Sequence, residues 1–205
     1  MILRKITKKI LLLVEGKDEE SFFEAFIEYL KLDLDSVDIF CVEGKNNFKN
    51  HIPVLFKNAG MDKVKKIAII RDADENAKSA LESIANVLMK VGVKKSKRDE
   101  YIFNGRKVFI YIMPDNKNKG MLETLCLKSV KNNPVMTCVN KFERCLKHIN
   151  TNPKNMEKTK SLVFLAAMPE DVHSVGIGAK KGYWDFSAKE FESLKKFIKK
   201  LIKPI

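Results

Sequence analysis

Residues 10–18, Ile-Leu-Leu-Leu-Val-Glu-Gly-Lys-Asp, join a short apolar run to an acidic end. The run of five aliphatic residues predicts a strand that is buried on both faces, as the strands of parallel sheets are. A second run, Ile-Ala-Ile-Ile at residues 67–70, ends in Arg-Asp-Ala-Asp at residues 71–74. Ligands of open α/β sheets bind outside the carboxyl ends of the strands. We therefore expect the two acidic ends to meet in one site that holds a divalent cation.

Strand and helix patterns alternate along the first two thirds of the chain. This alternation predicts an α/β fold, a mostly parallel sheet of about four strands with helices on both faces. The charged residues 94–104 are expected to form a loop. Strands are predicted at residues 10–15, 37–42, 66–71 and 108–113, and helices at residues 18–30, 51–58, 76–91 and 120–130.

Beyond Pro134 the pattern becomes helical. We predict an α/β domain at residues 1–130 and a helical C-terminal extension at residues 131–205, which docks on it to form one compact unit. Within the extension, residues 176–184 are basic, aromatic and rich in glycine, which favours a flexible loop. Two interpretations of this loop stay open: phosphate contacts through Lys180 and Lys181, or an anchor formed by Trp184 in the core. Helices are predicted at residues 139–149, 158–168 and 187–202.

The chain of 205 residues has a formal net charge of +13, which favours polyanionic partners. A lysine-rich surface without a binding role explains the charge equally well. Only five of the 39 basic residues are Arg, and Arg binds phosphate better than Lys because its guanidinium group can donate two hydrogen bonds at once. No apolar run approaches the ~20 residues of a membrane helix, so we expect a cytoplasmic protein with no membrane partner. The unpaired spacing of the four cysteines predicts reduced thiols. Cys138, Cys145 and His148 remain an alternative set of zinc ligands.

Asp72 and Asp74 are the candidate metal ligands. In an extended segment residues i and i+2 point the same way, so both carboxylates are expected to face one cation. Glu15 is expected beside them, where crowding by other acids raises its pKa and suits it to move a proton. Carboxylates without Cys or His favour Mg²⁺ or Mn²⁺ over Zn²⁺. The pattern therefore favours metal-dependent phosphodiester chemistry.

With both motifs identified, residues 8 to about 125 resemble the Toprim family. This catalytic domain is shared by topoisomerases, bacterial primases and several nucleases, among them the overcoming-lysogenisation-defect group. The match is closest to small stand-alone Toprim-like proteins, in which a Pro-Asp…Gly-Met-Leu-Glu segment follows the DxD motif. Here that segment is Pro114-Asp115…Gly120-Met121-Leu122-Glu123.

The resemblance implies a Toprim-like fold and nuclease-like chemistry on nucleic acid, with DNA or RNA left open. By that resemblance Glu15 is the acid/base, Asp72 and Asp74 are the magnesium ligands, and Glu123 is an additional acid for a second metal. Oligomeric state is left open, a homodimer included.

Further charged residues near the motifs have two interpretations. Asp18 and Asp115 are auxiliary acids of the site, or they cap a helix and a turn. Lys17 contacts a phosphate, or it is a solvated charge at a helix start. Glu43 heads a second copy of the Val-Glu-Gly-Lys motif at residues 42–45, but we prefer the first copy because an acidic helix start follows it.

The chain also departs from the Toprim pattern. Ala77 stands three residues after the second aspartate, where many Toprim sequences have glycine, and no Walker A loop is present. Two rival functions remain: a non-catalytic Toprim-like module that binds nucleic acid or a partner, and a haloacid-dehalogenase-like phosphatase. The phosphatase would use Asp72 as nucleophile and Asp74 as acid, and it gives Glu15 no role.

Overall fold

A computed structural model of the chain describes residues 5–96 and 100–203. Its centre is one six-stranded sheet with the strand order β2-β1-β3-β6-β5-β4. The strands β2, β1, β3 and β6 are parallel, whereas β5 and β4 add antiparallel to the β6 edge. The strands are β1 (Ile10–Val14), β2 (Val37–Cys41), β3 (Lys66–Asp72), β4 (Lys94–Lys95), β5 (Tyr101–Phe103) and β6 (Arg106–Met113).

The predicted α/β class and the parallel centre are confirmed, but the prediction of about four strands is wrong. Residues 94–104, expected to be a loop, contain the antiparallel strands β4 and β5. Both are short, and the exposed edge strand β4 consists of two lysines. Charged, short edge strands protect a sheet from pairing with other chains, and they lack the apolar alternation by which strands are found in sequence.

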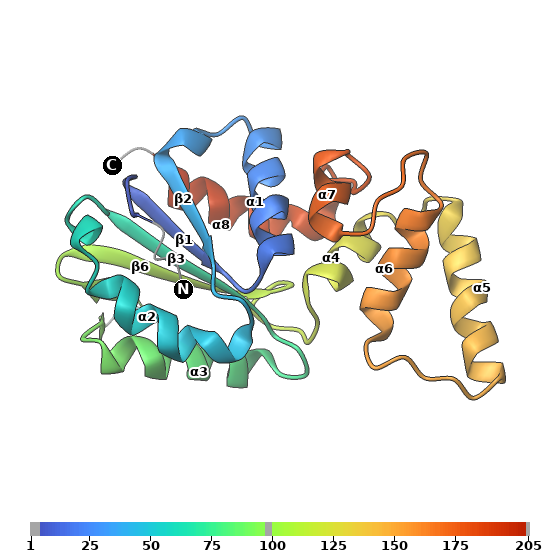
Figure 1. Cartoon of the computed structure of the whole chain (residues 1–205), viewed down its shortest axis with the longest axis horizontal. Helices are drawn as coiled ribbons and strands as arrows, with labels where there is room; N and C mark the ends of the chain where they lie inside the picture. Colours follow the sequence, from blue (N-terminus) through green and yellow to red (C-terminus); the bar gives the residue numbers. More distant parts are fainter. Residues whose placement is uncertain (1–4, 97–99, 204–205) are drawn as a thin grey trace.

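Helices cover both faces of the sheet (Figure 1). The strand β1 is buried along its whole length: Ile10, Leu12 and Val14 face one apolar cluster, while Leu11 and Leu13 face the other. The cluster of Leu11 and Leu13 is completed by α2 and α3, the other one by α1, α4 and α8. The helices are α1 (Lys17–Tyr29), α2 (Phe48–Phe56), α3 (Ala77–Lys90), α4 (Leu122–Ser129), α5 (Val135–His148), α6 (Met156–Ala166), α7 (Val175–Lys180) and α8 (Glu192–Ile202).

The C-terminal segment returns to the sheet. Phe186 and Phe191 stack around Phe22 and Phe26 of α1, with ring centroids 5.0–6.1 Å apart, and α8 contributes Leu194 and neighbouring residues to the same cluster. Aromatic pairs at such distances stabilise a core beyond the area they bury. The end of the chain thus shares a core with its beginning.

The expectation of a flexible loop at residues 176–184 is wrong, because residues 175–180 form the helix α7. Trp184 is 2 % exposed, donates to the carbonyl of Val175 and stacks on Phe164, as expected for a core anchor. The glycines that suggested flexibility instead allow close packing of α7. In the sequence, glycine spacing alone does not separate these two uses.

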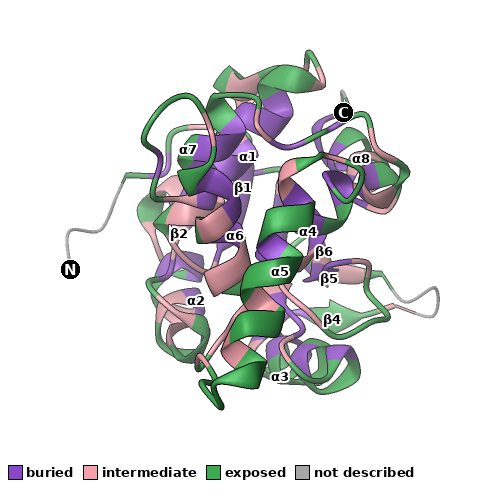
Figure 2. Cartoon of the chain, turned by 90° about the vertical axis from the view of Figure 1, so that its right-hand side faces the viewer, coloured by how far each residue is buried: buried purple, intermediate pink, exposed green. Residues whose placement is uncertain are grey.

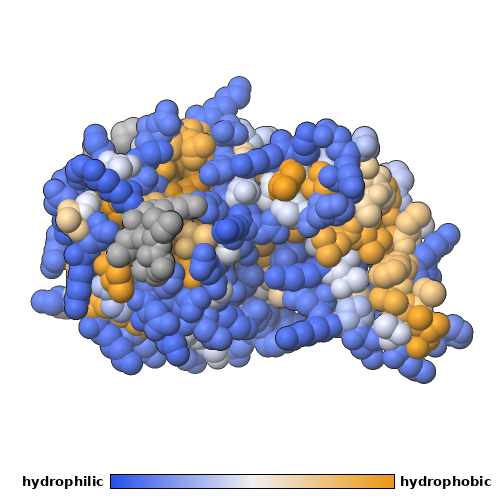
Figure 3. All heavy atoms as spheres, in the orientation of Figure 1, coloured by the Kyte–Doolittle hydropathy of each residue, from blue (hydrophilic) through white to orange (hydrophobic). Residues whose placement is uncertain are grey.

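The helices α5 and α6 form an arm at one end of the molecule (Figure 1). Seen from that end, α5 presents a largely exposed surface (Figure 2). Phe142, Ile149 and Leu162 are exposed, and apolar atoms gather over the arm (Figure 3). In the described ranges, no helix has the length and hydropathy that crossing a membrane requires.

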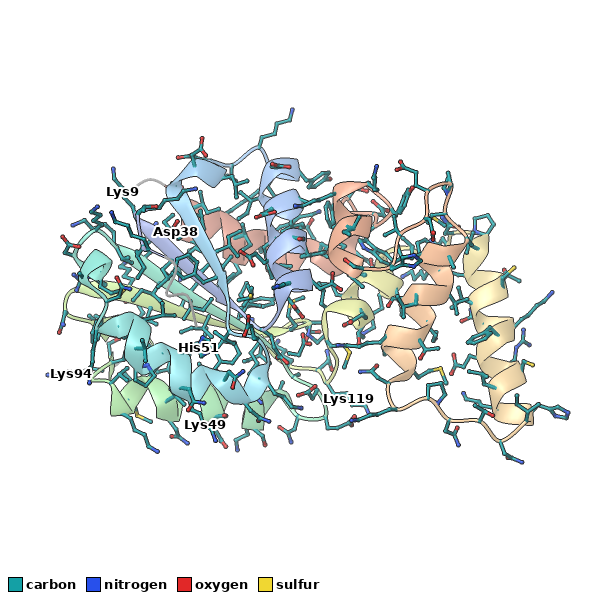
Figure 4. The ribbon with its side chains drawn as sticks, in the orientation of Figure 1. Lys9, Asp38, Lys49, His51, Lys94 and Lys119 are labelled. Carbon is teal, nitrogen blue, oxygen red and sulfur yellow. The ribbon has the colours of Figure 1, made fainter. Side chains whose placement is uncertain are left out.

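Asp38 ties the segment before β1 to the sheet. Its carboxylate lies on β2 (Figure 4) and is 9 % exposed. It accepts hydrogen bonds from the backbone N–H groups of Thr7 at 2.7 Å and Lys8 at 2.9 Å. Charge-assisted bonds of this kind are stronger than neutral ones, so a buried acid outside the candidate site has a structural role.

Gly176 sets the distance between α7 and α1. A Cβ at this position would clash with the carbonyl oxygen of Asp18 and come 2.8 Å from the Cβ of Ser21. We therefore expect Gly176→Ala to lower the free energy of unfolding by about 2 kcal/mol, as overpacking does, in urea denaturation. The neighbouring Ile177→Ala, whose side chain is 47 % exposed, should change it by less than about 0.5 kcal/mol. Equal effects would contradict the packing argument.

Candidate functional site

The strand pairing brings Glu15 and Asp72 together. The strands β1 and β3 are parallel neighbours, with Leu13 paired to Ile69. Two residues further on, Glu15 follows the end of β1 beside the last residues of β3, where Asp72 stands. Both carboxyl groups therefore lie at the carboxyl edge of the sheet, as parallel pairing requires.

Asp72 connects the sheet to α4. The residue is 7 % exposed, and its Oδ1 accepts a hydrogen bond of 3.1 Å from the backbone N–H of Leu122, the first residue of α4. The N-terminus of a helix favours negative charge, so this bond holds α4 against β3. It also brings Glu123, the second residue of α4 and 7 % exposed, to the acids of the strands.

Asp74 is placed by a backbone bridge. Its N–H donates to the carbonyl of Gly120 at 3.0 Å and the N–H of Gly120 donates back at 2.8 Å. The extended conformation expected through Asp74 is wrong, because its φ is +51°. Asp72 is therefore buried while Asp74 stays partly exposed at the edge, where its carboxylate pairs with Lys45 at 2.7 Å.

A fifth acid, Glu19, belongs to this group, although no motif of the sequence pointed to it as a site residue. Burial, aided by the negative charges of Glu123, Glu15 and Asp18, raises its pKa to about 7. Glu19 lies in the first turn of α1, where acids are common because the helix dipole favours negative charge. The sequence therefore carried no signal that separates it from an ordinary first-turn acid.

The pKa values of the other acids shift in the same direction. Burial raises the pKa of Asp72 well above its ordinary value, and the charges of Glu19, Glu15, Glu123 and Asp74 add to the shift. Burial likewise raises the pKa of Glu15, with Asp74 as the next cause, and that of Glu123. Each acid disfavours the ionised form of the others, while the charges of Arg71 and Lys45 act in the opposite direction on the pKa of Glu15.

Lysines partly offset this charge. Besides Lys45, which pairs with Asp74, Lys158 of α6 lies 3.7 Å from Glu123. Burial lowers the pKa of Lys158, but the charges of Glu123, Glu19, Asp72 and Glu15 outweigh it, so that the net shift is upward. Lys45 comes from the second Val-Glu-Gly-Lys copy, which therefore contributes its lysine to the site, whereas its Glu43 is exposed.

The chemical type of these carboxylate donors, but not their present placement, suits a hard divalent cation. Among the residues that the structure describes, Glu15 Oε2, Glu123 Oε2 and Arg71 Nε are buried without a hydrogen-bond partner, an arrangement that costs free energy unless something satisfies these atoms. Carboxylate oxygens without Cys or His suit Mg²⁺ or Mn²⁺. Within residues 5–96 and 100–203, however, no three Asp, Glu, His or Cys side chains converge in a geometry that could hold a metal ion. The acids thus form an electrostatic cluster whose side chains must turn to share a cation.

The remaining candidate residues have other partners, although Asp18 also adds to the upward pKa shifts of Glu19 and Glu123. Asp18, expected to cap α1, instead accepts hydrogen bonds from Ser174 Oγ and the N–H of Gly176 and so secures the start of α7; the N-cap position of α1 is Gly16. Asp115 accepts bonds from the N–H groups of the turn that follows it. Lys17 is exposed.

Lys180 and Lys181, candidates for nucleic-acid contact, pair with acids of neighbouring segments. Lys180 bonds Glu24 of α1 at 2.7 Å, and Lys181 bonds Glu170 at 2.5 Å. Both pairs are exposed and contribute little to stability. The nearby hollow of about 920 Å³ is lined by Tyr29, Tyr183 and other residues, but by none of the five clustered acids.

Comparison with known proteins identifies a family and a fold. A family model described as "Protein of unknown function (DUF3226)" matches residues 9–203. A hypothetical protein of Pyrococcus horikoshii is 19 % identical, with a TM-score of 0.62 and 95 % of each chain covered. The C-terminal region of the Burkholderia pseudomallei OLD protein is 14 % identical, with a TM-score of 0.51, covering 96 % of this chain and 99 % of that one. The search of curated proteins found no match.

Proposed function

The chain belongs to the DUF3226 family of proteins of unknown function. We propose that it catalyses Mg²⁺-dependent phosphodiester chemistry on nucleic acid, as a nuclease-like enzyme of the Toprim type. One observation carries the proposal. Glu15, Glu19, Asp72, Asp74 and Glu123 lie close enough at the carboxyl edge of the parallel strands that burial and their repulsion raise the pKa values of the first three, and within the described residues two of their buried carboxylate oxygens have no hydrogen-bond partner. The fold shared with the OLD C-terminal region, whose group the Toprim resemblance includes, supports it.

The proposed roles follow from burial and charge. Asp72 and Asp74 are the metal ligands, with Glu123 as an additional ligand. Bound Mg²⁺ would offset the negative charge that develops on a phosphodiester in its transition state. Glu15 is the acid/base, because a raised pKa brings a carboxyl group closer to neutral pH, where proton transfer is efficient. Glu19 shares this electrostatic environment.

The positive side chains at the edge of the cluster complete the arrangement. Lys45 and Lys158 contact Asp74 and Glu123 in this structure. Both are surface lysines, so each ammonium group could leave its carboxylate partner and pair with a phosphate of a substrate strand. The net charge of +13 supports attraction of such a strand to an otherwise negative site.

The test is cleavage of labelled single- and double-stranded DNA and RNA in Mg²⁺, Mn²⁺ or EDTA. We expect metal-dependent cleavage that Glu15→Gln lowers by about 100-fold or more, the usual size of a lost acid/base. The matched control is Glu43→Gln, which makes the same change in the second Val-Glu-Gly-Lys copy, where the side chain is exposed. Wild-type activity in both variants would contradict the role of Glu15.

A non-catalytic module is the competing function. It is favoured by the hydrogen bond from Leu122 to Asp72 and by the Lys45–Asp74 pair, both of which give the aspartates structural partners. A module of this kind predicts no cleavage and no rise of the melting temperature with Mg²⁺, whereas an enzyme with a metal site predicts both. The phosphatase receives less support, since the proposed nucleophile Asp72 is 7 % exposed.

A further inference from the structure

A lysine-lined hollow lies at the end of the sheet opposite to the acid cluster. The hollow has a volume of about 490 Å³, and five of its seven lining residues are lysines. In the whole chain the 39 basic residues less five Arg leave 34 lysines in 205 residues, so lysine is enriched about fourfold here. The lining residues are Lys65, Lys66, Gly105, Lys107, Phe109, Lys200 and Lys203.

Three chain segments distant in sequence bring these lysines together. Lys65 and Lys66 stand at the start of β3, Lys107 at the start of β6, and Lys200 and Lys203 at the end of α8. The strands begin at the edge of the molecule where Figure 4 labels Lys9 and Lys94, away from the α5–α6 arm. Parallel pairing aligns Lys66 with Lys107, so the accumulation of charge follows from the topology of the sheet.

The positive charge of this hollow is not neutralised by acids. Lys66 donates to the carbonyl groups of Leu201 at 2.9 Å and Lys203 at 2.6 Å, at the end of α8. No carboxylate lines the hollow, and within the described residues none of its five lysines forms an ion pair with an acid. Burial, with repulsion from Lys107 and Lys203, lowers the pKa of Lys66. An anion would relieve this repulsion.

Aromatic side chains continue the surface. A second hollow of about 500 Å³ shares Lys107, Phe109 and Lys200 with the first and adds Tyr101, Phe197 and one acid, Glu100. Lys200 already lies over the ring of Phe109, 5.4 Å from its centroid. Lysines along a groove together with accessible rings are the elements with which proteins bind phosphates and stack unpaired bases.

We propose that these adjoining hollows form a second nucleic-acid site, which binds the phosphates and bases of single-stranded nucleic acid apart from the acid cluster. The lysines contact the phosphates, and Phe109 with its aromatic neighbours receives a base. The site would recognise a phosphate together with a base. A free nucleotide carries the same two groups and is therefore a smaller ligand that could bind there. The proposal does not rest on catalysis at the acid cluster.

Binding of a fluorescein-labelled oligothymidylate, measured by anisotropy in EDTA, tests the proposal independently of cleavage. We expect Lys107→Glu combined with Lys200→Glu to weaken binding by more than 10-fold. The matched control combines Lys31→Glu with Lys57→Glu, two exposed lysines outside both hollows, and changes the net charge equally. We expect it to weaken binding by less than threefold. Equal weakening in both double variants, or no binding to the wild type, would overturn the site.

Two further arms identify the ligand. Phe109→Leu keeps apolar volume but removes the ring, so we expect it to weaken oligothymidylate binding while binding of inorganic tripolyphosphate is retained. An equal loss for both ligands would overturn the base contact. If ADP displaces the labelled oligothymidylate at a concentration equal to that of the oligonucleotide, the ligand is a nucleotide. If only longer strands displace it, the ligand is single-stranded nucleic acid that spans both hollows. Asp72→Asn, which should abolish cleavage, should leave this binding unchanged.

Discussion

Asp72→Asn should abolish metal-dependent cleavage and at the same time make the metal-free protein more stable. The loss of activity is expected to be about 1,000-fold, because the variant removes a charge that a metal ion needs, and electrostatic contributions of this kind are large. The gain in stability follows from the surroundings of the carboxylate, which is buried and surrounded by Glu19, Glu15 and Glu123. The asparagine Oδ1 can still accept the bond from the N–H of Leu122, so the link to α4 survives.

The measurements are initial cleavage rates and melting temperature in EDTA at pH 8. A rise of several degrees is expected, and Mg²⁺ should no longer raise the melting temperature of the variant. Asp115→Asn is the matched control. In an exposed turn its carboxylate accepts hydrogen bonds from backbone N–H groups, which lower its pKa. The control variant should therefore be slightly less stable than the wild type and keep its activity. A variant Asp72→Asn that is less stable than the wild type would show that Asp72 is a structural cap alone.

The metal-free chain should lose stability as the pH rises from 5 to 8. Glu19 has an ordinary pKa of 4.5 and a pKa of about 7 in the fold, so between these values the folded state binds more protons than the unfolded state. The free energy of unfolding then falls with rising pH. One pKa unit corresponds to about 1.4 kcal/mol, which gives on the order of 3 kcal/mol for Glu19. The pKa shifts of Glu15, Asp72 and Glu123 act in the same direction.

Melting curves in EDTA at pH 5 and pH 8 check this prediction. A difference of about 3 kcal/mol corresponds to roughly 6–12 °C for a chain of this size. Acids with a lowered pKa, such as Asp115 and Glu143, change stability only below their ordinary pKa values near pH 4. They therefore do not offset the loss of stability between pH 5 and pH 8. Glu19→Gln should make the profile less steep, with the remaining slope due to Glu15, Asp72 and Glu123, and Mg²⁺ should restore stability at pH 8. A flat profile in the wild type would show that the acids do not repel one another as proposed.

The local pattern of the chain was enough to predict the central strands. Each residue of β1 is buried, and an uninterrupted aliphatic run has no other stable place than between two layers of helices. The end of α3 could also be predicted. Helices often end at a residue in the left-handed conformation, which glycine adopts most easily, and Gly92 has a φ of +91°. The antiparallel strands β4 and β5 were missed, because β4 consists of two lysines and β5 has only three residues, too few to show a strand pattern.

The candidate site was readable only in part. Acids that directly follow apolar strands identified Glu15 and Asp72, and the Toprim resemblance added Glu123. The sequence did not show that Asp72 accepts a bond from Leu122, 50 positions away, nor that Lys158 lies beside Glu123. Asp18 was misread as the cap of its own helix, because a residue that secures a helix more than 150 positions away leaves no local signal.

The buried central strands and the carboxylates at their ends can be predicted from the residues in order, since burial pattern and strand-end chemistry are properties of neighbouring residues. Which of those charges share one environment became known from the folded chain alone. The raised pKa of Glu19 and the lysine-lined hollow beside Phe109 both depend on residues that lie far apart in the chain and close together in the fold. The physical reason is that charge–charge interaction and desolvation depend on distance and burial in the folded chain, and position along the chain encodes neither.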